Sequence, residues 1–513
     1  MTKDVNLVLT PEEASDEKAV IRKASSSLGM SHKRIRGVRY IRKSIDARRR
    51  DVRINLLVRV FIDEDVKSTW TQTSFPVLDE SSPSVIVVGS GPAGLFAALT
   101  LLEKGISPVV LERGKDVHER KKDCALLCTR GILDGNSNYS FGEGGAGAYS
   151  DGKLFTRSVK RGDVGKVLSL FVQHGADENI LYEAHPHIGT DRLPSVIENI
   201  RNTIINSGGE VHFNTLVTSL TRSGDKITGV RCSDGSEFTG PVILATGHSA
   251  KDVYRFLDKD GIRLEPKDTA VGVRVEHPQA LIDSIQYHSP GGRGRWLPPA
   301  TYSFVTQVGG RGVYSFCMCP GGSVVPAATE EGMQVVNGMS SSSRSGRFAN
   351  AAFVVQIRES DIPGKGVWAM MDWVENIERR SFIEGFKAPA VRMSDFVERR
   401  ISTTLPQSTY APGCVSSDLY SVLPPLVSES LASGFRDFDR FTRGRFITED
   451  ALLLGSETRT SAPVRIIRDE RFRVMDGLYA AGEGAGYAGG IVSAAVDGTE
   501  TAKRVAEDIW NRS

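Results

Sequence analysis

The sequence predicts an α/β protein whose main domain is interrupted by a mixed α+β insertion and preceded by a small α+β domain. Short apolar strands alternate with helices from residue 84 to about 250, the alternation weakens from about 265 to 440, and it returns after about 450. The first eighty residues differ, with one amphipathic helix and one long alternating strand. We therefore expect a small domain over 1–80, a main domain split into 81–260 and 446–513, and an insertion over 261–445.

The composition excludes several classes of protein. Among 513 residues, 25% are charged and 40% hydrophobic, which is the balance of a globular chain rather than a disordered one. The net charge of +2 argues against a protein that coats nucleic acid over its whole surface. The N-terminus lacks the apolar core of a secretory signal, and no stretch of eighteen apolar residues occurs. Six scattered cysteines suggest reduced thiols. We expect a cytoplasmic protein with no membrane partner and no metal site.

The small N-terminal domain has clear local signals. Thr10-Pro11-Glu12-Glu13 predicts a helix start with a capping box, and Gly29 predicts its end. Between Asp51 and Asp63, apolar residues occupy every second position, which predicts a strand with one buried face. A helix covering one face of a sheet is typical of a ferredoxin-like α+β unit, which is the fold we predict here.

The charge of this domain is uneven. Residues 33–59 contain eleven basic residues against only Asp46 and Asp51. Two interpretations stay open: the basic face docks on an acidic neighbouring domain, or it binds RNA or another polyanion. The run Arg48-Arg49-Arg50 motivates the second interpretation, although nucleic-acid binding is the less favoured of the two. Only Tyr40 supplies an aromatic ring inside the basic segment.

A dinucleotide site follows the connector. The apolar strand 84–88 runs into Gly89-Ser90-Gly91-Pro92-Ala93-Gly94, then into a helix, and a second strand ends at Glu112. This is the strand, G-x-G-x-x-G turn, helix and acid of a Rossmann-like domain. The first glycine permits the tight turn, the second leaves room for a pyrophosphate, and the third lets helix and strand pack closely. Glu112 is placed to accept hydrogen bonds from ribose hydroxyls.

Three further features favour FAD over NAD as the dinucleotide. Val242 to Gly247 is an apolar strand that ends in Ala245-Thr246-Gly247 and follows a strand meander. Gly477 to Glu483 is another apolar strand, ending in Gly482-Glu483. A glycine-rich turn then leads into a helix that begins near Ile491. The main domain is thus predicted to be an FAD-binding Rossmann-like α/β domain.

These segments resemble the glutathione-reductase-like flavoprotein superfamily. The resemblance implies that Glu483 binds the ribityl chain, and that Gly490 and Ile491 lie beside the isoalloxazine at the N-terminus of the last helix. More narrowly, five segments resemble a bacterial family of FAD-dependent dehydrogenases with one Rossmann-like domain and an inserted substrate domain. These segments are 43–48, 144–154, 185–191, 316–322 and 457–465.

The complete set of predicted cofactor contacts combines the motif with the resemblance. The loop 142–147 is predicted to touch the pyrophosphate or the flavin. The set is Gly89, Ser90, Gly91, Pro92, Ala93, Gly94, Glu112, Arg113, Gly145, Ala146, Val217, Ala245, Thr246, Gly247, Gly482, Glu483, Gly490 and Ile491.

Candidate catalytic residues are His185, His187 and Lys153. A histidine beside a flavin can donate or accept a proton near neutral pH, or orient a carboxylate substrate. Both histidines can equally be structural, held by the backbone and by Asp191. Lys153 closes the glycine-rich loop, where it is predicted to contact phosphates or the flavin N5 region, or to lie on the surface.

The sequence predicts an FAD-dependent oxidoreductase, a dehydrogenase or reductase that acts on a small molecule between the main and inserted domains. No second strand–GxGxxG–helix–acid unit occurs in 250–450, so NADH or NADPH would act only as a transient electron donor. One alternative is a flavoprotein recruited to RNA or another polyanion through the basic domain. The other is a scaffold that FAD stabilises without turnover. The sequence leaves the substrate and the oligomeric state open.

Overall fold

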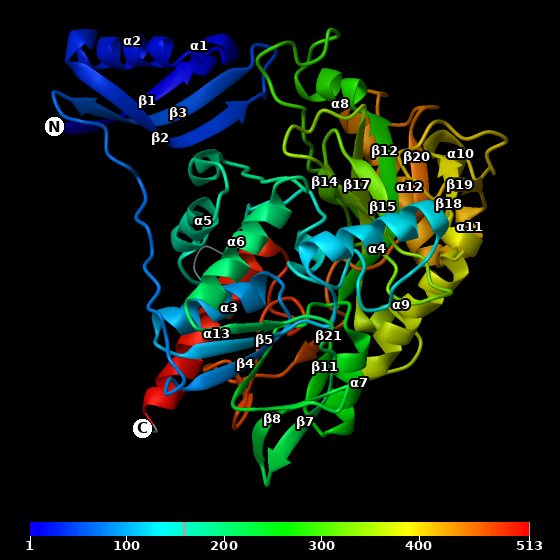
Figure 1. Ribbon diagram of the computed structural model, residues 1–513. Coiled ribbons are helices and arrows are strands. Elements are labelled where there is room, and N and C mark those ends of the chain that lie inside the picture. The colour runs from blue at the N-terminus through cyan, green and yellow to red at the C-terminus, as the bar shows by residue number, and fades with distance from the viewer. Residues whose placement is uncertain (157–160, 512–513) are drawn as a thin grey trace.

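A six-stranded sheet forms the centre of the computed structural model, which describes residues 1–156 and 161–511. Five of its strands are parallel, and β22 joins one edge in the antiparallel direction (Figure 1). The order across the sheet is β22-β23-β10-β4-β5-β6. The strands are β4 (Ser84–Val88), β5 (Ser107–Leu111), β6 (Glu210–His212), β10 (Val242–Leu244), β22 (Arg473–Met475) and β23 (Leu478–Ala480).

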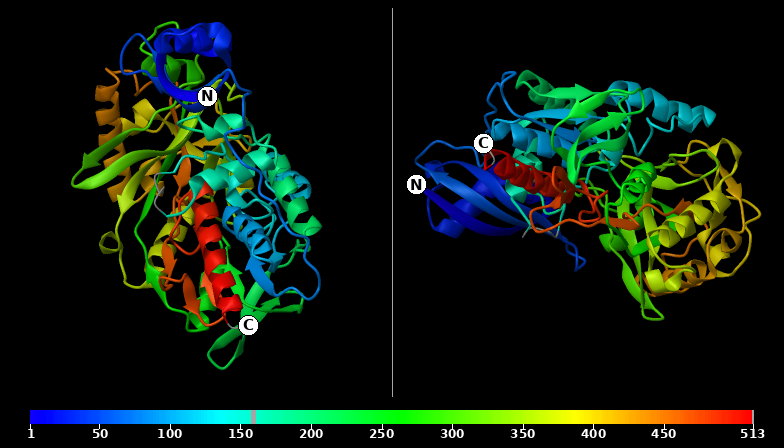
Figure 2. Two further views of the ribbon diagram at one scale, coloured as in Figure 1. Left: turned by 90° about the vertical axis from the view of Figure 1, so that its left-hand side faces the viewer. Right: turned by 90° about the horizontal axis from the view of Figure 1, so that it is seen from below.

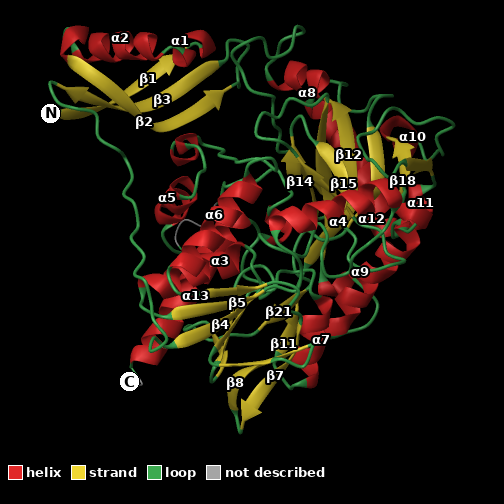
Figure 3. Cartoon of the chain, in the orientation of Figure 1, coloured by secondary structure: helices red, strands yellow, loops and turns green. Residues whose placement is uncertain are grey.

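Helices α3 (Pro92–Glu103) and α13 (Ile491–Trp510) pack against each other on one face of this sheet (Figure 3). A Cβ on Gly498 of α13 would lie 2.0 Å from the carbonyl oxygen of Ala93, so only glycine allows this close approach. Helices α4 (Val117–Arg130), α5 (Val164–Gln173) and α6 (Leu193–Asn206) extend the same layer. The first and last segments of the main domain are therefore held together by direct helix packing.

The other face carries a small antiparallel sheet and one helix. Strands β7 (Val217–Ser223), β8 (Lys226–Cys232) and β9 (Glu237–Thr239) form an antiparallel meander, and α7 (Lys251–Lys259) follows β10. Apolar side chains of the meander and α7 form one buried cluster with Ile86 and Val88 of β4. The central strand β4 is thus buried on both faces, which explains its unbroken apolar sequence.

The inserted domain is built on a seven-stranded sheet in the order β13-β14-β17-β12-β20-β18-β19. Helix α12 crosses one face, where Phe353 is fully buried among Phe435, Phe438 and Phe446. Its strands are β12 (Thr269–Pro278), β13 (Val305–Val308), β14 (Arg311–Cys319), β17 (Phe348–Ile357), β18 (Ala388–Arg392), β19 (Cys414–Ser416) and β20 (Leu452–Glu457), beside the hairpin β15 (Ser323–Pro326) and β16 (Val336–Met339). Its helices are α8 (Gln279–Gln286), α9 (Val367–Ser381), α10 (Met393–Val397), α11 (Leu419–Val422) and α12 (Pro425–Phe441).

The end of the insertion differs from the prediction. We placed residues from 446 onward in the main domain, but β20 pairs with β12 and β18 inside the seven-stranded sheet. The apolar, glycine-containing sequence of β20 is like that of a main-domain strand, and its true partners are distant in the sequence. The chain leaves and re-enters the main domain through a two-stranded ribbon of β11 (Leu264–Pro266) and β21 (Val464–Ile466).

The N-terminal domain is a three-stranded antiparallel sheet in the order β1-β3-β2, with two helices on one face. The predicted capping box is present, because Thr10 accepts from the Glu13 amide and Glu13 accepts from the Thr10 amide. Within residues 1–80 there is no fourth strand and no helix after the third strand, so the unit matches only the first part of a ferredoxin-like fold. Its elements are β1 (Thr2–Leu9), α1 (Pro11–Ser15), α2 (Glu17–Leu28), β2 (Ile35–Asp46) and β3 (Arg53–Ile62).

Strand β2 contacts the main domain through the segment 178–184 (Figure 2). The amide of Lys43 donates to the Tyr182 carbonyl, and the Lys43 ammonium lies 2.8 Å from Glu183. The ring of Tyr40 packs against that of Tyr182 in a tilted arrangement, with centroids 5.1 Å apart. One part of the basic strand thus does dock on acidic groups of a neighbouring domain, as the first of our two interpretations held.

No helix among the described residues combines the length and the apolar character that crossing a membrane requires.

We expect Phe353→Ala to lower the free energy of unfolding of the inserted domain by about 3–5 kcal/mol, because it removes a fully buried ring from an aromatic cluster. The matched control is Phe441→Ala, whose ring is 60% exposed at the end of α12 and should cost well under 1 kcal/mol. Urea unfolding followed by near-UV circular dichroism measures both variants. Equal losses in the two would contradict this account of the core.

Candidate active site at the junction of the two domains

A cavity of about 340 Å³ lies where the carboxyl ends of β4, β5 and β10 face the inserted domain. The main domain contributes the glycine-rich turn and the segments that follow these strands, and the inserted domain contributes Phe316, Cys317 and Asn337. The carboxyl ends of parallel strands are the usual ligand site of open α/β sheets. The position of the cavity therefore agrees with the position that the motif predicted.

The glycine-rich turn is shaped by contacts that exclude side chains. Gly89 has a φ of +104°, and a Cβ there would lie 2.5 Å from the Ala245 carbonyl oxygen. A Cβ on Gly94 would lie 1.9 Å from the Gly89 oxygen. Gly91 differs, because it lines the cavity and its Cβ would meet nothing closer than Gly145 at 3.8 Å. The N-terminus of α3 is thus left open to a ligand on the Gly91 side.

Glu112 stands at the end of β5, and its side chain is fully engaged by the protein. One carboxylate oxygen accepts from the amide and hydroxyl of Ser90, at 2.9 and 2.7 Å. The other accepts from the amides of Gly114 and Gly142, at 2.9 and 3.1 Å. Of the four donors, only the Ser90 hydroxyl can rotate away and free a lone pair for a ribose hydroxyl.

The loop 142–147 closes over this turn. The Gly144 amide donates to the Ser90 carbonyl at 3.0 Å, and a Cβ on Gly145 would lie 3.2 Å from the Gly91 Cα. Gly145, Ala146 and Gly147 all line the cavity. The loop that we predicted to touch the cofactor therefore forms the wall opposite the α3 N-terminus.

Helix α13 begins at Ile491, with Gly490 as its N-cap, and both residues line the cavity. No atom lies within 4 Å of a Cβ built on Gly489 or Gly490, so this helix N-terminus is also open to the cavity. Glu483, which we predicted as a ribityl ligand, lines the cavity and accepts from His248 at 2.9 Å. His248 follows Ala245-Thr246-Gly247 directly, and we did not single it out because a lone histidine after a strand carries no distinct signal.

Lys153 faces the cavity from the end of the glycine-rich loop. Its ammonium lies 2.9 Å from Asp151 and also donates to the Met318 carbonyl. Asp151 additionally pairs with the guanidinium of Arg344. Burial by itself would lower the pKa of Lys153, but the adjacent Cys319, Asp151 and Cys317 outweigh it and raise that pKa. Since one carboxylate faces two cations, this corner of the cavity carries an uncompensated positive charge.

The two predicted histidines lie behind this corner. Neither His185 nor His187 lines the cavity. The His185 ring packs at a tilt against that of Phe155, with centroids 5.0 Å apart. His187 hydrogen-bonds the Ser342 carbonyl at 3.1 Å and forms a β-bridge with Lys153. Burial and then the charge of Arg344 lower the pKa of both imidazoles, so both are neutral at pH 7. The geometry places them in support of the Lys153 loop, and Asp191 instead binds Ser342.

Cys317 opens onto the cavity from a bulge in β14. The register of β14 with β17 shifts between Phe316 and Cys319, and Cys317 has a φ of +47°. The buried guanidinium of Arg274 holds this bulge by donating to the Cys317 carbonyl at 2.8 Å. A bulge beside a site commonly turns a side chain toward it. Cys317 is an exposed residue of the cavity lining.

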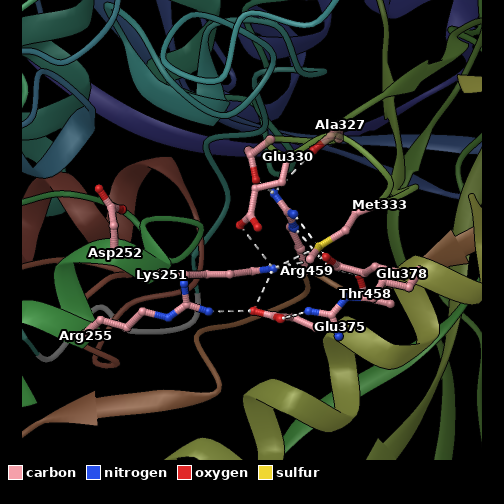
Figure 4. A network of polar contacts seen from close by, with 12 residues as sticks. Lys251, Asp252, Arg255, Ala327, Glu330, Met333, Glu375, Glu378, Thr458 and Arg459 are labelled. Carbon is pink, nitrogen blue, oxygen red and sulfur yellow. Dashed lines mark hydrogen bonds and ion pairs between the residues drawn. The ribbon is translucent and has the colours of Figure 1, made fainter. Parts of the chain in front are cut away.

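Arg459 belongs both to the cavity wall and to a buried ion cluster (Figure 4). Its guanidinium contacts both oxygens of Glu378 at 3.2 Å and the Thr329 hydroxyl at 2.9 Å. Lys251, at the start of α7, lies 3.3 Å from Glu378 and from Glu375. The cluster therefore ties the main domain to α9 of the insertion, and it fixes Arg459 at the edge of the cavity.

Fifteen of the eighteen predicted cofactor contacts line the cavity. They are Gly89, Gly91, Pro92, Ala93, Glu112, Arg113, Gly145, Ala146, Val217, Ala245, Thr246, Gly247, Glu483, Gly490 and Ile491. Ser90, Gly94 and Gly482 do not line it. Ser90 is turned toward Glu112, and the two glycines pack against Gly89 and Ala93. Sequence reasoning did not predict the inserted-domain wall at Phe316 and Asn337, because no local motif marks it.

Comparison with known proteins now adds to this geometry. Residues 268–460 match a family model described as "FAD-dependent protein, C-terminal domain-like", and residues 82–129 match an "FAD binding domain". Residues 1–61 match a domain of unknown function. An uncharacterized protein of Clostridium beijerinckii is 39% identical over 98% of both chains. The chain belongs to this family of FAD-dependent proteins. Its cofactor is FAD.

Solved structures of flavoenzymes are similar at a lower level. Tetracycline destructase Tet(51) is 12% identical over 85% of this chain and 84% of its own, with a TM-score of 0.36. CtdE in complex with FAD and a substrate is 12% identical over 83% and 80%, with a TM-score of 0.36. The glycerol-3-phosphate dehydrogenase of Bacillus halodurans, complexed with FAD, is 11% identical over 84% and 65%, with a TM-score of 0.38. Likeness at this level carries no argument about the reaction.

The cavity of this flavoprotein fits an extended dinucleotide. The N-termini of α3 and α13 open onto it next to each other, because a Cβ on Gly147 would lie 3.1 Å from Ile491 and 3.8 Å from Pro92, and the glycines at both leave the backbone accessible. Among the described residues, no group of three or more histidine, cysteine, aspartate or glutamate side chains gathers to hold a metal ion.

We expect Gly91→Ala to abolish tight FAD binding without unfolding the apoprotein. The added methyl group has 3.8 Å of clearance within the protein, but it would occupy the open side of the α3 N-terminus. FAD binding should weaken at least about tenfold, and the rise in melting temperature on adding FAD should disappear. Gly135→Ala, whose Cβ meets only Thr329 at 3.6 Å outside the cavity, is the control. Unchanged FAD affinity in Gly91→Ala would contradict the assignment.

We expect Glu378→Gln to destabilise the protein at pH 7 by about 3–5 kcal/mol, because it leaves two buried cations without their shared carboxylate. Burial would raise the pKa of Glu378, yet Arg459 and Lys251 lower it from 4.5 to about 2. The stability that this ionised group contributes is therefore present above about pH 4.5 and is lost as the pH falls toward 2. Across that pH window, the melting temperature should fall more steeply with decreasing pH for the wild type than for the variant. The exposed Glu384→Gln should leave both the stability and the slope unchanged.

Proposed function

We propose that this flavoprotein is an oxidoreductase, a dehydrogenase or reductase, whose small-molecule substrate binds between the main and inserted domains. The supporting observation is that one continuous cavity is lined by both the dinucleotide turn and inserted-domain residues, namely Phe316, Cys317 and Asn337. A site that only stored FAD would need no contribution from the inserted domain. FAD supplies electron-accepting and electron-donating chemistry when it is bound.

In this proposal the main domain holds the two halves of the cofactor. The open N-terminus of α3 at Gly91 and the loop at Gly145 would bind the pyrophosphate, where free amides and the helix dipole favour negative charge. Glu112 would bind the ribose by releasing the Ser90 hydroxyl. Glu483, held in place by His248, would bind the ribityl chain. The N-terminus of α13 would then face the flavin ring.

Lys153 would supply charge to the reacting end of the cavity. Its pKa is raised, so the ammonium stays protonated throughout the physiological range. Together with Arg344 it exceeds the single charge of Asp151, and the surplus favours an anionic substrate or the negative charge of the reduced cofactor. Phe155 and Phe316 provide apolar walls. A small anionic molecule with an apolar body is therefore the substrate class that this chamber suits best.

NADH or NADPH is proposed as a transient electron donor, since only one nucleotide-binding unit occurs in the sequence. The purified holoprotein should lose its flavin absorbance near 450 nm under anaerobic conditions, with NADH, with NADPH or with one member of a panel of small carboxylate metabolites. The test is decisive in both directions. A correctly bound FAD that none of these reagents reduces would support a scaffold that FAD merely stabilises, and would overturn the proposed activity.

We expect Lys153→Met to make the midpoint potential of the bound flavin more negative. Loss of a cation that stabilises the reduced cofactor by about 1.4 kcal/mol corresponds to a shift of about 30 mV for a two-electron couple. Lys166→Met, whose ammonium pairs with Glu103 on the helical layer, is the control and should leave the potential unchanged. Spectroelectrochemical titration measures both. An unchanged midpoint potential in Lys153→Met would show that the Lys153 ammonium does not stabilise the reduced cofactor.

A further inference from the structure

We propose that a basic and aromatic surface at the joint between the N-terminal and inserted domains binds single-stranded nucleic acid. This surface, called the arginine joint below, consists of the β2–β3 turn and the loop that follows α8. Its residues are Arg48, Arg49, Arg50, Arg53, Arg293, Arg295 and Trp296. It lies away from the FAD cavity, so it would add a recruitment function to the proposed enzyme and does not depend on the proposed reaction.

The first half of the arginine joint is the turn between β2 and β3. Arg48, Arg49 and Arg50 are consecutive and exposed. Arg48 pairs with Asp46 within the turn. Among the described residues, Arg49, Arg50 and Arg53 have no ion-pair partner, so their charges are available to a ligand. This distinguishes them from Lys43 and Arg39 on the same hairpin, which pair with Glu183 and Glu178 of the main domain.

The second half is the loop Gly291-Gly292-Arg293-Gly294-Arg295-Trp296. The guanidinium of Arg295 lies over the Trp296 ring at 4.7 Å from its centroid, and both side chains are exposed, the tryptophan by 43%. Arg293 lies 3.8 Å from the buried Asp283, which anchors the loop to α8. The three glycines of this loop have no side chains that could cover the Arg295–Trp296 pair, so the pair stays open to solvent. The basic segment of the N-terminal domain contains only one aromatic residue, Tyr40, and Trp296 supplies the exposed ring that this segment lacks.

Apolar packing brings the two halves together. Ala47 and Val52, on either side of the arginine run, pack against the core of the inserted domain. Leu297, next to Trp296, packs against both the N-terminal core and the inserted-domain core. Figures 1 and 2 both show the N-terminal domain beside α8 at one end of the molecule. The arginine joint is therefore one surface made from segments more than 200 residues apart in the sequence.

The chemistry of this surface fits a single strand better than a duplex. Arginine side chains neutralise backbone phosphates, and exposed aromatic rings stack on unpaired bases. The bases of a duplex are already stacked on each other, so Trp296 would have nothing to bind there. Six arginines face the local acids Asp46, Asp51 and Asp283, which leaves the joint positively charged.

Fluorescence anisotropy of the full-length holoprotein with labelled oligo(U) RNA and oligo(dT) DNA of about 20 nucleotides tests the proposal. We expect micromolar or tighter binding at about 0.1 M salt, and weaker binding to a duplex of the same length. The slope of log affinity against log salt should be about −0.7 for each phosphate contacted. Arg49, Arg50, Arg53 and Arg295 have no ion-pair partner among the described residues. If each of these four neutralises one phosphate, the slope should be about −3.

Two kinds of variant separate charge from stacking. Arg49→Ala with Arg50→Ala should reduce the salt slope by about 1.4 and weaken binding at low salt. Trp296→Ala should weaken binding about tenfold while the salt slope stays the same. Lys226→Ala removes an exposed cation from the meander at the opposite end of the main domain and should change neither. All variants should keep the FAD absorbance and melting temperature of the wild type.

The same measurements define the results that would overturn the proposal. Binding that Lys226→Ala weakens as much as the arginine-joint variants would show nonspecific attraction to the whole surface. Vesicles with anionic lipid that bind in place of oligonucleotides would assign the joint to a membrane surface. A concentration-dependent dimer that Trp296→Ala dissociates would assign it to a second copy of the chain. Failure of NADH, NADPH and the metabolite panel to reduce the flavin would count against the proposed enzyme activity and would leave this inference unaffected.

Discussion

The close approach of backbone to backbone around the glycine-rich turn is the constraint on which the cavity depends. Gly94 rests against the Gly89 carbonyl, and Gly498 of the last helix rests against Ala93 of the first. The contact between Gly498 and Ala93 brings the two halves of the split main domain together, and the same helices point their N-termini into one cavity. A methyl group at Gly498 would push α13 away from α3, and one at Gly94 would push α3 away from the turn at Gly89. The main-domain core is therefore held together by its own contacts, whatever the length of the insertion.

Two buried ion clusters also fix the positions of charged side chains at the cavity. Glu378 of α9 holds Arg459 and Lys251 together across the domain junction, and Arg459 reaches the cavity wall. Asp151 does the same for Lys153 and Arg344. In the second cluster one buried carboxylate faces two cations, so part of their charge remains for a ligand, whereas Lys251 in the first also lies 3.3 Å from Glu375. Buried ion pairs of this kind contribute little net stability, but they fix geometry and are costly to break.

The basic residues of the N-terminal domain fall into two groups that differ in their partners. Lys43 and Arg39 of strand β2 dock on acidic residues of the main domain, which accounts for part of the basic segment. Arg49, Arg50 and Arg53 have no ion-pair partner among the described residues, and Leu297 of the arginine- and tryptophan-containing loop packs against the core of the same domain. Counting charges along the sequence cannot separate these groups, because pairing depends on which distant segment each residue faces.

The sequence by itself determined the strand–turn–helix of the dinucleotide site, the capping box at Thr10, and fifteen wall residues of the cavity, because each depends on contacts between near neighbours or on an extended motif. Only the tertiary structure decided the rest. It assigned β20 to the insertion, left the N-terminal sheet with three strands, and moved His185 and His187 behind Lys153. It also brought His248 to Glu483 and Cys317 to the cavity. Those outcomes rest on pairing between segments far apart in the chain, for which no local pattern exists.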